Sequence, residues 1–171
     1  MADTKSNLEK FNTLVNPENK AVYYKSKDKK GPNANRVAGS TISDCYEQLS
    51  DEFFNIKMAS HSIGIVDIDI DDQKEKDMLV ADLENRGLKY VLVATEKGGH
   101  YHIIMKRPPD MKTAILVNGT KRSWISHDYK MVGPNFLMYW GPILPTSYNN
   151  REFVIIPDTL DTMPEDWIEE E

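Results

Sequence analysis

The chain contains a single cysteine, Cys45, among its 171 residues. One thiol cannot form an internal disulfide or a multi-cysteine zinc site, so the folded state must depend on an apolar core. The sequence also lacks any apolar run near the ~20 residues that a membrane-spanning helix requires. Its first residues are polar, unlike a secretion signal. These absences favour a soluble, cytoplasmic protein with no membrane partner.

Charge is distributed unevenly along the chain. The net charge of −6 argues weakly against a nucleic-acid partner, but residues 158–171 hold seven of the 27 acidic residues and no Lys or Arg. The remaining 20 acidic residues nearly balance 21 basic ones, so local basic clusters matter more than the total charge. The length fits one domain. We therefore expect a single domain over residues 1–157 and an acidic tail or linker over 158–171.

The order of apolar and polar residues predicts an α+β fold. Residues 60–142 begin with a strand, a helix and a second strand, followed by a tight turn and a third strand. This pattern is typical of a ferredoxin-like or RRM-like palm sheet with flanking helices, and residues 1–60 would add a small α/β extension. Further expected elements are helices with the apolar stripes Leu8-Phe11-Leu14-Val15 and Ile42-Cys45-Tyr46-Leu49, strands over 21–24, 123–129, 136–140 and 153–156, and a short helix or linker around 163–168.

The helix after the first palm strand carries its own start and stop signals. Asp72 stands at the N-cap, Glu75 follows three residues later, and Gly87 stands at the C′ position. Met78, Leu79 and Leu83 have the spacing of one buried face. The helix should therefore bury these three side chains.

A row of carboxylates at the end of an apolar strand is the most informative feature of the sequence. Side chains alternate along a strand, so Asp67, Asp69 and Asp71 share one face while the other face is apolar. Like charges side by side on a half-buried sheet are costly unless they are neutralised, and oxygen ligands suit Mg²⁺ or Mn²⁺. Acidic strand ends also occur without a metal, and Asp72 is better explained as a helix cap.

A glycine-rich turn and two histidines form a second group. Backbone amides in such a turn can hold a phosphate, and Lys97 can add charge. His100 and His102 follow on one strand face. Alternatively, the two histidines are ordinary half-exposed strand residues without a functional role. This explanation fits His100 better than His102, because His102 directly precedes an apolar run.

A third group of polar residues lies at the end of the strand predicted over residues 123–129. Asp128 lies near its end, before a hairpin, and Lys130 falls on the same side. If that strand neighbours the Asp67 strand, Asp128 completes a three-carboxylate site.

The order of these groups resembles the archaeo-eukaryotic primase superfamily, most closely the bifunctional primase-polymerase (prim-pol) domains of phages, plasmids and mobile elements. The resemblance covers about residues 60–142. One extra residue separates the two glycines from His102, which we take as the motif histidine because an apolar run follows it. The family pattern Asp-x-Asp, Thr-x-Ser-Gly-Gly-x-His, Asp-x-Arg/Lys and Gly-x-Tyr corresponds here to Asp67-x-Asp69, Thr95-x-Lys97-Gly98-Gly99-His100-Tyr101-His102, Asp128-x-Lys130 and Gly133-x-Asn135-Phe136.

The resemblance implies a template-dependent nucleotidyltransferase, a DNA primase and polymerase that makes or extends primers on single-stranded DNA from NTPs or dNTPs. Asp67, Asp69 and Asp128 would hold two divalent ions, Mg²⁺ or Mn²⁺. A replicative helicase, fused or separate, would be its protein partner, in the host cytoplasm if the gene belongs to a phage. The nucleotide-binding residues implied are His102, Lys97, Lys130, Thr95, Gly98, Gly99 and His100.

Two other functions remain open. His100-Tyr101-His102 also resembles the His-hydrophobic-His metal motif of HUH-type single-stranded DNA endonucleases, the rolling-circle initiators, with Tyr129 as a possible nucleophile. That function needs both histidines on the metal and nothing from Asp67 or Asp69. The third possibility is a replication accessory module that binds DNA or a helicase without catalysis.

Overall fold

Three α-helices and three antiparallel sheets make up the fold in the computed structural model, which describes residues 4–16, 22–26, 37–38, 41–59, 65–70, 72–95, 99–107, 115–117 and 143–170. None of the helices in these ranges is long and apolar enough to cross a membrane. Both helices and strands occur along the chain, so the predicted mixed α and β composition is confirmed.

Two of the sheets have four strands each. The first has the order β2 (Val37–Ala38), β1 (Val22–Ser26), β3 (Asn55–Ala59), β8 (Ile143–Leu144). The second has the order β4 (Ile65–Ile70), β6 (Tyr101–Lys106), β5 (Val91–Thr95), β9 (Arg151–Ile155). The third sheet pairs β7 (Ile115–Val117) with β10 (Ile168–Glu170).

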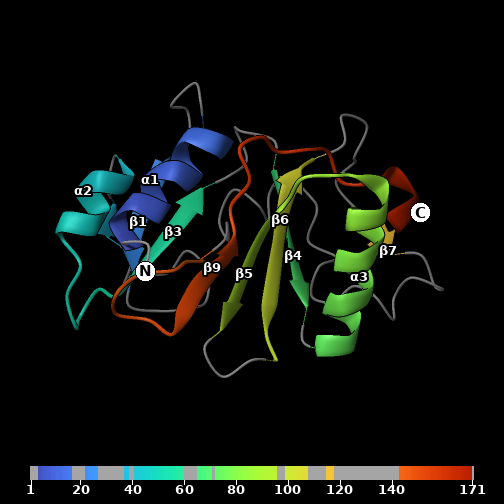
Figure 1. Ribbon diagram of the computed structural model, residues 1–171. Helices are drawn as coiled ribbons and strands as arrows, with labels where there is room; N and C mark the ends of the chain where they lie inside the picture. Colours follow the sequence, from blue (N-terminus) through green and yellow to red (C-terminus); the bar gives the residue numbers. More distant parts are fainter. Residues whose placement is uncertain are drawn as a thin grey trace.

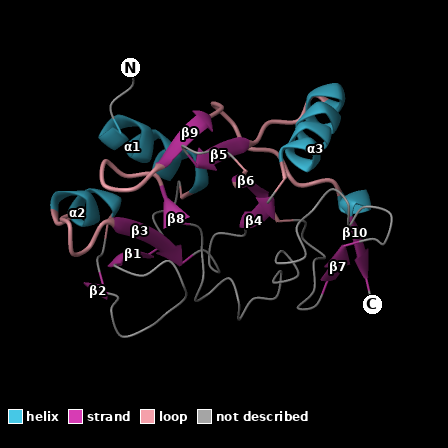
Figure 2. Ribbon diagram, turned by 90° about the horizontal axis from the view of Figure 1, so that it is seen from below, coloured by secondary structure: helices cyan, strands magenta, loops and turns pink. Residues whose placement is uncertain are grey.

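The helices lie on different sides of the second sheet. Helices α1 (Thr4–Val15) and α2 (Ile42–Glu47) accompany β1 and β3, whereas α3 (Gln73–Arg86) lies on the far side of β4 and β6 (Figure 1). Figure 2, turned by 90°, shows the same separation, with β7 and β10 at the same end of the molecule as α3. The second sheet therefore stands between two groups of helices.

Each face of the second sheet contributes to its own apolar core. Because side chains alternate along a strand, Val66, Ile68 and Ile70 join the core beneath α3, whereas Ile65 joins the core that contains α1, α2 and the first sheet. Val93 and Ile104 lie with Ile65 in that second core. The alternation predicted for the Asp67 strand is thus confirmed for its apolar residues.

Local signals fix the start of α2 and both ends of α3, and the ends of α3 are those that the sequence predicted. The Thr41 hydroxyl accepts a hydrogen bond from the Asp44 N–H at 2.9 Å and caps α2, and the Asp72 carboxylate accepts one from the Glu75 N–H at 3.1 Å and caps α3. Gly87 ends α3 at φ +71°, a left-handed conformation that glycine adopts without a steric penalty. These contacts span only three or four residues, so the local sequence is sufficient to predict contacts of this kind.

The predicted buried face of α3 was wrong at one position. Leu79 and Leu83 are fully buried, but the Met78 side chain is 46% exposed, and Val80 packs against the core instead. Residues 78 and 80 lie on either side of the Leu79–Leu83 line. The apolar spacing fits either choice, so the rotation of the helix against the sheet decides which one is buried.

The C-terminal segment predicted as a tail or linker is part of the core. Leu160, Met163 and Trp167 are buried, and the Trp167 indole N–H donates to Asp82 of α3 at 2.7 Å. The predicted short helix is a 3-10 turn, Glu165–Trp167, followed by β10, so β9 is not the last strand. High acidic content suggested a solvated segment, but three apolar side chains are enough to anchor it.

Most of the other predicted elements are confirmed with shifted ends. The apolar stripes lie in α1 and α2, and the predicted strands correspond to β1, β4, β5, β6 and β9. The strands predicted over 123–129 and 136–140 lie outside the described residues.

Candidate functional site

Two of the sequence motifs meet at one end of the second sheet. Strand β4 runs from the buried Ile65 toward Asp67 and Asp69, and β6 pairs with it in antiparallel register, so β6 begins where β4 ends. Asp69 stands opposite His102 in this register, and Asp67 stands opposite Ile104. Only the backbone of Asp69 is described. Sheet pairing therefore brings the predicted carboxylates and the predicted histidine to neighbouring strands.

The Asp67 carboxylate is in direct contact with the His102 imidazole. Asp67 Oδ1 lies 2.9 Å from His102 Nδ1, and the two side chains are only 13% and 16% exposed, respectively. A hydrogen bond between half-buried groups is electrostatically stronger than the same bond in water. The contact therefore holds the carboxylate and the ring in a defined relative orientation.

Arg151 contacts the opposite nitrogen of the same imidazole. Its Nη1 atom lies 3.1 Å from His102 Nε2. A guanidinium carries donors and no acceptor, so Nε2 must accept this hydrogen bond. The proton of a neutral ring then lies on Nδ1, which donates to Asp67. The arrangement is a directional chain in which Arg151 donates to His102 and His102 donates to Asp67.

Arg151 reaches the site from β9, at the edge of the described sheet. Arg151 stands opposite Thr95 of β5. Strand β5 lies between β9 and β6, which carries His102. The Asn149 amide oxygen accepts from the Arg151 backbone N–H at 3.2 Å and from the Thr146 N–H at 3.0 Å. The same amide donates to the Leu144 carbonyl at 3.1 Å and to the Asn55 amide oxygen at 3.0 Å. Asn149 thus links the two large sheets and fixes the start of β9.

Arg151 is the site residue that the sequence did not reveal. No local sequence pattern singled it out; in the structure, residues 151, 153 and 155 are partly buried and alternate with the exposed residues 152 and 154. That alternation places Arg151 on the face of Phe153. It does not indicate that β9 pairs with β5, which is what brings Arg151 within reach of His102.

The remaining predicted site residues have different outcomes. Thr95 and His100 close the turn between β5 and β6 through a backbone hydrogen bond from the Thr95 N–H to the His100 carbonyl at 3.1 Å. Gly99 has φ +85°, and His100 is exposed. The other four predicted residues lie outside the described part of the chain: Lys97, Gly98, Asp128 and Lys130.

The residues present fit a divalent metal in part. Within the described ranges no group of three His, Cys, Asp or Glu side chains is close enough to hold a metal ion, and the predicted third ligand, Asp128, lies outside them. Asp67 supplies hard carboxylate oxygen and is oriented by a hydrogen-bonded neighbour, as ligating carboxylates usually are. Asp67 is thus suited to be one ligand of an oxygen-rich site.

The geometry is less favourable for a two-histidine metal site. Both ring nitrogens of His102 contact protein groups, and the group at Nε2 is a cation. His100 precedes β6 and is exposed. Coordination by both histidines would therefore require either Arg151 or Asp67 to leave its ring nitrogen of His102.

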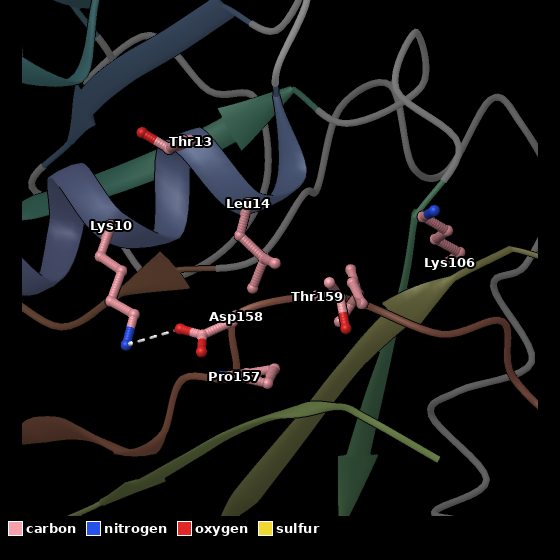
Figure 3. A pocket seen from close by; sticks show the side chains of 8 residues that line it. Lys10, Thr13, Leu14, Lys106, Pro157, Asp158 and Thr159 are labelled. Carbon is pink, nitrogen blue, oxygen red and sulfur yellow. Dashed lines mark ion pairs between the residues drawn. The ribbon is translucent and has the colours of Figure 1, made fainter.

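A separate pocket of about 490 Å³ lies at the other end of β6, between α1 and residues 157–160 (Figure 3). Lys10 and Asp158 form an ion pair across it at 3.8 Å, and Lys106 lines its far side. Lys106 is four residues along the strand from His102, roughly 13 Å at the rise of a β-strand. The pocket and the Asp67 site are therefore distinct features.

No protein-family model matches the chain, and neither a curated protein nor a solved structure matches it.

Proposed function

We propose that the protein is a cytoplasmic template-dependent nucleotidyltransferase that makes or extends primers on single-stranded DNA. The observation that carries this proposal is the contact between Asp67 and His102. These residues come from two motifs 35 positions apart, and the proposed activity requires both at one site. The register that sets Asp69 opposite His102 adds support.

The strand order is compatible with the palm sheet that such enzymes use. Strand β4, α3, β5 and β6 follow one another along the chain, and β6 lies between β4 and β5. We propose that these are the first four of the six elements of an RRM-like β-α-β-β-α-β unit.

In this proposal each residue has a defined task. Asp67, Asp69 and Asp128 would hold two divalent ions, Mg²⁺ or Mn²⁺, which supply charge neutralisation for the triphosphate and activation of the 3′-hydroxyl. His102 keeps the Asp67 carboxylate in one orientation, and Arg151 adds positive charge beside it. Lys97 and Lys130 would bind phosphate oxygens by charge-assisted hydrogen bonds. The chain thereby contributes positioning and electrostatic stabilisation.

Primer synthesis and extension on a single-stranded template test the proposal. Wild type is incubated with labelled NTPs or dNTPs and Mg²⁺ or Mn²⁺, beside Asp67→Asn and the control Asp51→Asn. Asparagine is nearly isosteric and can still accept from His102 Nδ1, so Asp67→Asn should fold. Its activity should fall by about 100-fold or more, as when a transition-state contact is removed. Asp51 is exposed on the α2–β3 connection, so its substitution should leave activity unchanged.

Other outcomes would favour the alternatives. Cleavage of single-stranded DNA with a Tyr129-linked product would overturn the proposal in favour of the endonuclease. Binding of single-stranded DNA without incorporation or cleavage would favour the accessory module. Equal incorporation by wild type and Asp67→Asn would show that the activity does not use this site.

A further inference from the structure

The chain of donors at the site has a direction. Arg151 can only donate, so His102 receives a hydrogen bond at Nε2 and gives one at Nδ1, and Asp67 receives it. An imidazole held at both nitrogens cannot rotate without breaking one of these contacts. Arg151 is thereby connected to the Asp67 carboxylate through the His102 ring.

We propose that Arg151 is a positioning residue for the metal-binding carboxylate, acting through His102. The inference rests on the metal role that the proposed function gives to Asp67. It also assigns His102 a task directed toward Asp67, which differs from the direct phosphate contact implied by the sequence resemblance. Groups that orient metal ligands in this way commonly change metal affinity by about 10–100-fold when they are removed.

The structure supports a fixed Arg151. Its backbone N–H is bound by Asn149, whose amide also contacts Leu144 and Asn55 of the first sheet. Arg151 is half-buried and begins a strand that pairs with β5. Fixed supporting residues of this kind are what a precisely oriented ligand requires.

Electrostatics alone predicts the opposite effect of removing Arg151. A guanidinium near a cation site repels the metal ion, so its loss should tighten metal binding. A positioning role predicts weaker binding, because the imidazole loses its restraint at Nε2. The sign of the change in affinity therefore separates the two explanations.

The experiment measures Mn²⁺ affinity in the full chain by electron paramagnetic resonance of free Mn²⁺. Arg151→Met should weaken the Asp67-dependent site by about 10-fold. Arg151→Lys keeps the charge and a donor, so it should retain most of the affinity. Lys106→Met removes one positive charge at the other end of β6 and should leave affinity unchanged or slightly tighter. Asp67→Asn identifies the site, and circular dichroism checks that each variant is folded.

A second readout tests the direction of the chain without metal. Nitrogen-15 chemical shifts of the imidazole, assigned with His102→Gln, should identify a neutral ring with its proton on Nδ1 in wild type. A proton on Nε2 would overturn the proposal. So would Mn²⁺ binding by Arg151→Met that equals or exceeds that of wild type, or the absence of an Asp67-dependent Mn²⁺ site.

The two proposals can fail separately. Primer synthesis by wild type, together with a Mn²⁺ affinity that Arg151→Met leaves unchanged, would refute the positioning role but support the nucleotidyltransferase activity. Mn²⁺ binding that depends on Asp67 and Arg151, without nucleotide incorporation, would refute the proposed nucleotidyltransferase activity but support the positioning role.

Discussion

Replacing Trp167 measures how far the acidic C-terminal segment belongs to the fold. The Trp167 ring is fully buried against the core beneath α3, and its N–H donates to Asp82 at 2.7 Å. Arg86 reinforces the contact, since it binds Asp82 at 3.2 Å and forms two hydrogen bonds with Asp166 at 2.9 and 2.8 Å. The substitution tests both burial and hydrogen bonding in one side chain.

Two substitutions separate these contributions. Trp167→Phe keeps an aromatic ring but loses a hydrogen bond to a charged group, worth about 1.5–3 kcal/mol. Asp82 is partly exposed and keeps Arg86, so we expect about 2 kcal/mol, near the lower end of that range. Trp167→Ala also removes the buried ring and should cost about 3–5 kcal/mol. Either loss is a large part of a typical stability of about 5–15 kcal/mol.

Urea unfolding followed by far-ultraviolet circular dichroism provides the measurement. The midpoint should shift with little change in the slope, because the same surface is exposed on unfolding. Asp166→Asn is the control, because this exposed ion pair should contribute at most about 1 kcal/mol. If Trp167→Ala costs less than about 1 kcal/mol, the segment is not part of the core and the reasoning fails.

Two further predictions concern the cores on the two faces of the second sheet. Burial, and then the neighbouring Asp44 carboxylate, raise the pKa of the Cys45 thiol to about 11 from an ordinary value of 9.0. Thiol reagents at pH 9 should therefore label the native protein far more slowly than the unfolded chain. Because the unfolded chain loses the proton first, this group's contribution to stability should be lost as pH rises from 9 toward about 11, and Cys45→Ala should lack that decline. On α3, Leu79→Ala should cost about 2–5 kcal/mol in urea unfolding, whereas Met78→Ala should stay within about 0.5 kcal/mol. Equal costs would contradict the observed rotation of the helix.

Short-range features were predictable because their causes lie within a few residues. Thr41, Asp72 and Gly87 act on backbone groups of the adjacent turn, and a change at any of them is visible in the local sequence. Strand alternation likewise assigned Asp67 to the face opposite Val66 and Ile68. The rotation of α3 was not predictable, since Met78 and Val80 differ only in which of them meets the sheet.

The candidate site was predictable only in its components. The sequence singled out Asp67 and His102 as separate motif residues, but their contact depends on the register between β4 and β6. Arg151 lies 49 residues from His102 and enters through the pairing of β9 with β5. No local pattern specifies which strands become neighbours, because pairing is selected by the packing of both cores together.

By itself, therefore, the sequence determined the ends of α3, the apolar face of the Asp67 strand and two chemically distinctive side chains. The tertiary structure alone decided that His102 is held between a carboxylate and a guanidinium, and that an acidic segment anchored by Trp167 completes the core beneath α3. The physical reason is the distance along the chain over which each interaction acts. Capping and alternation act over a few bonds, whereas strand order and burial depend on how distant segments together exclude water.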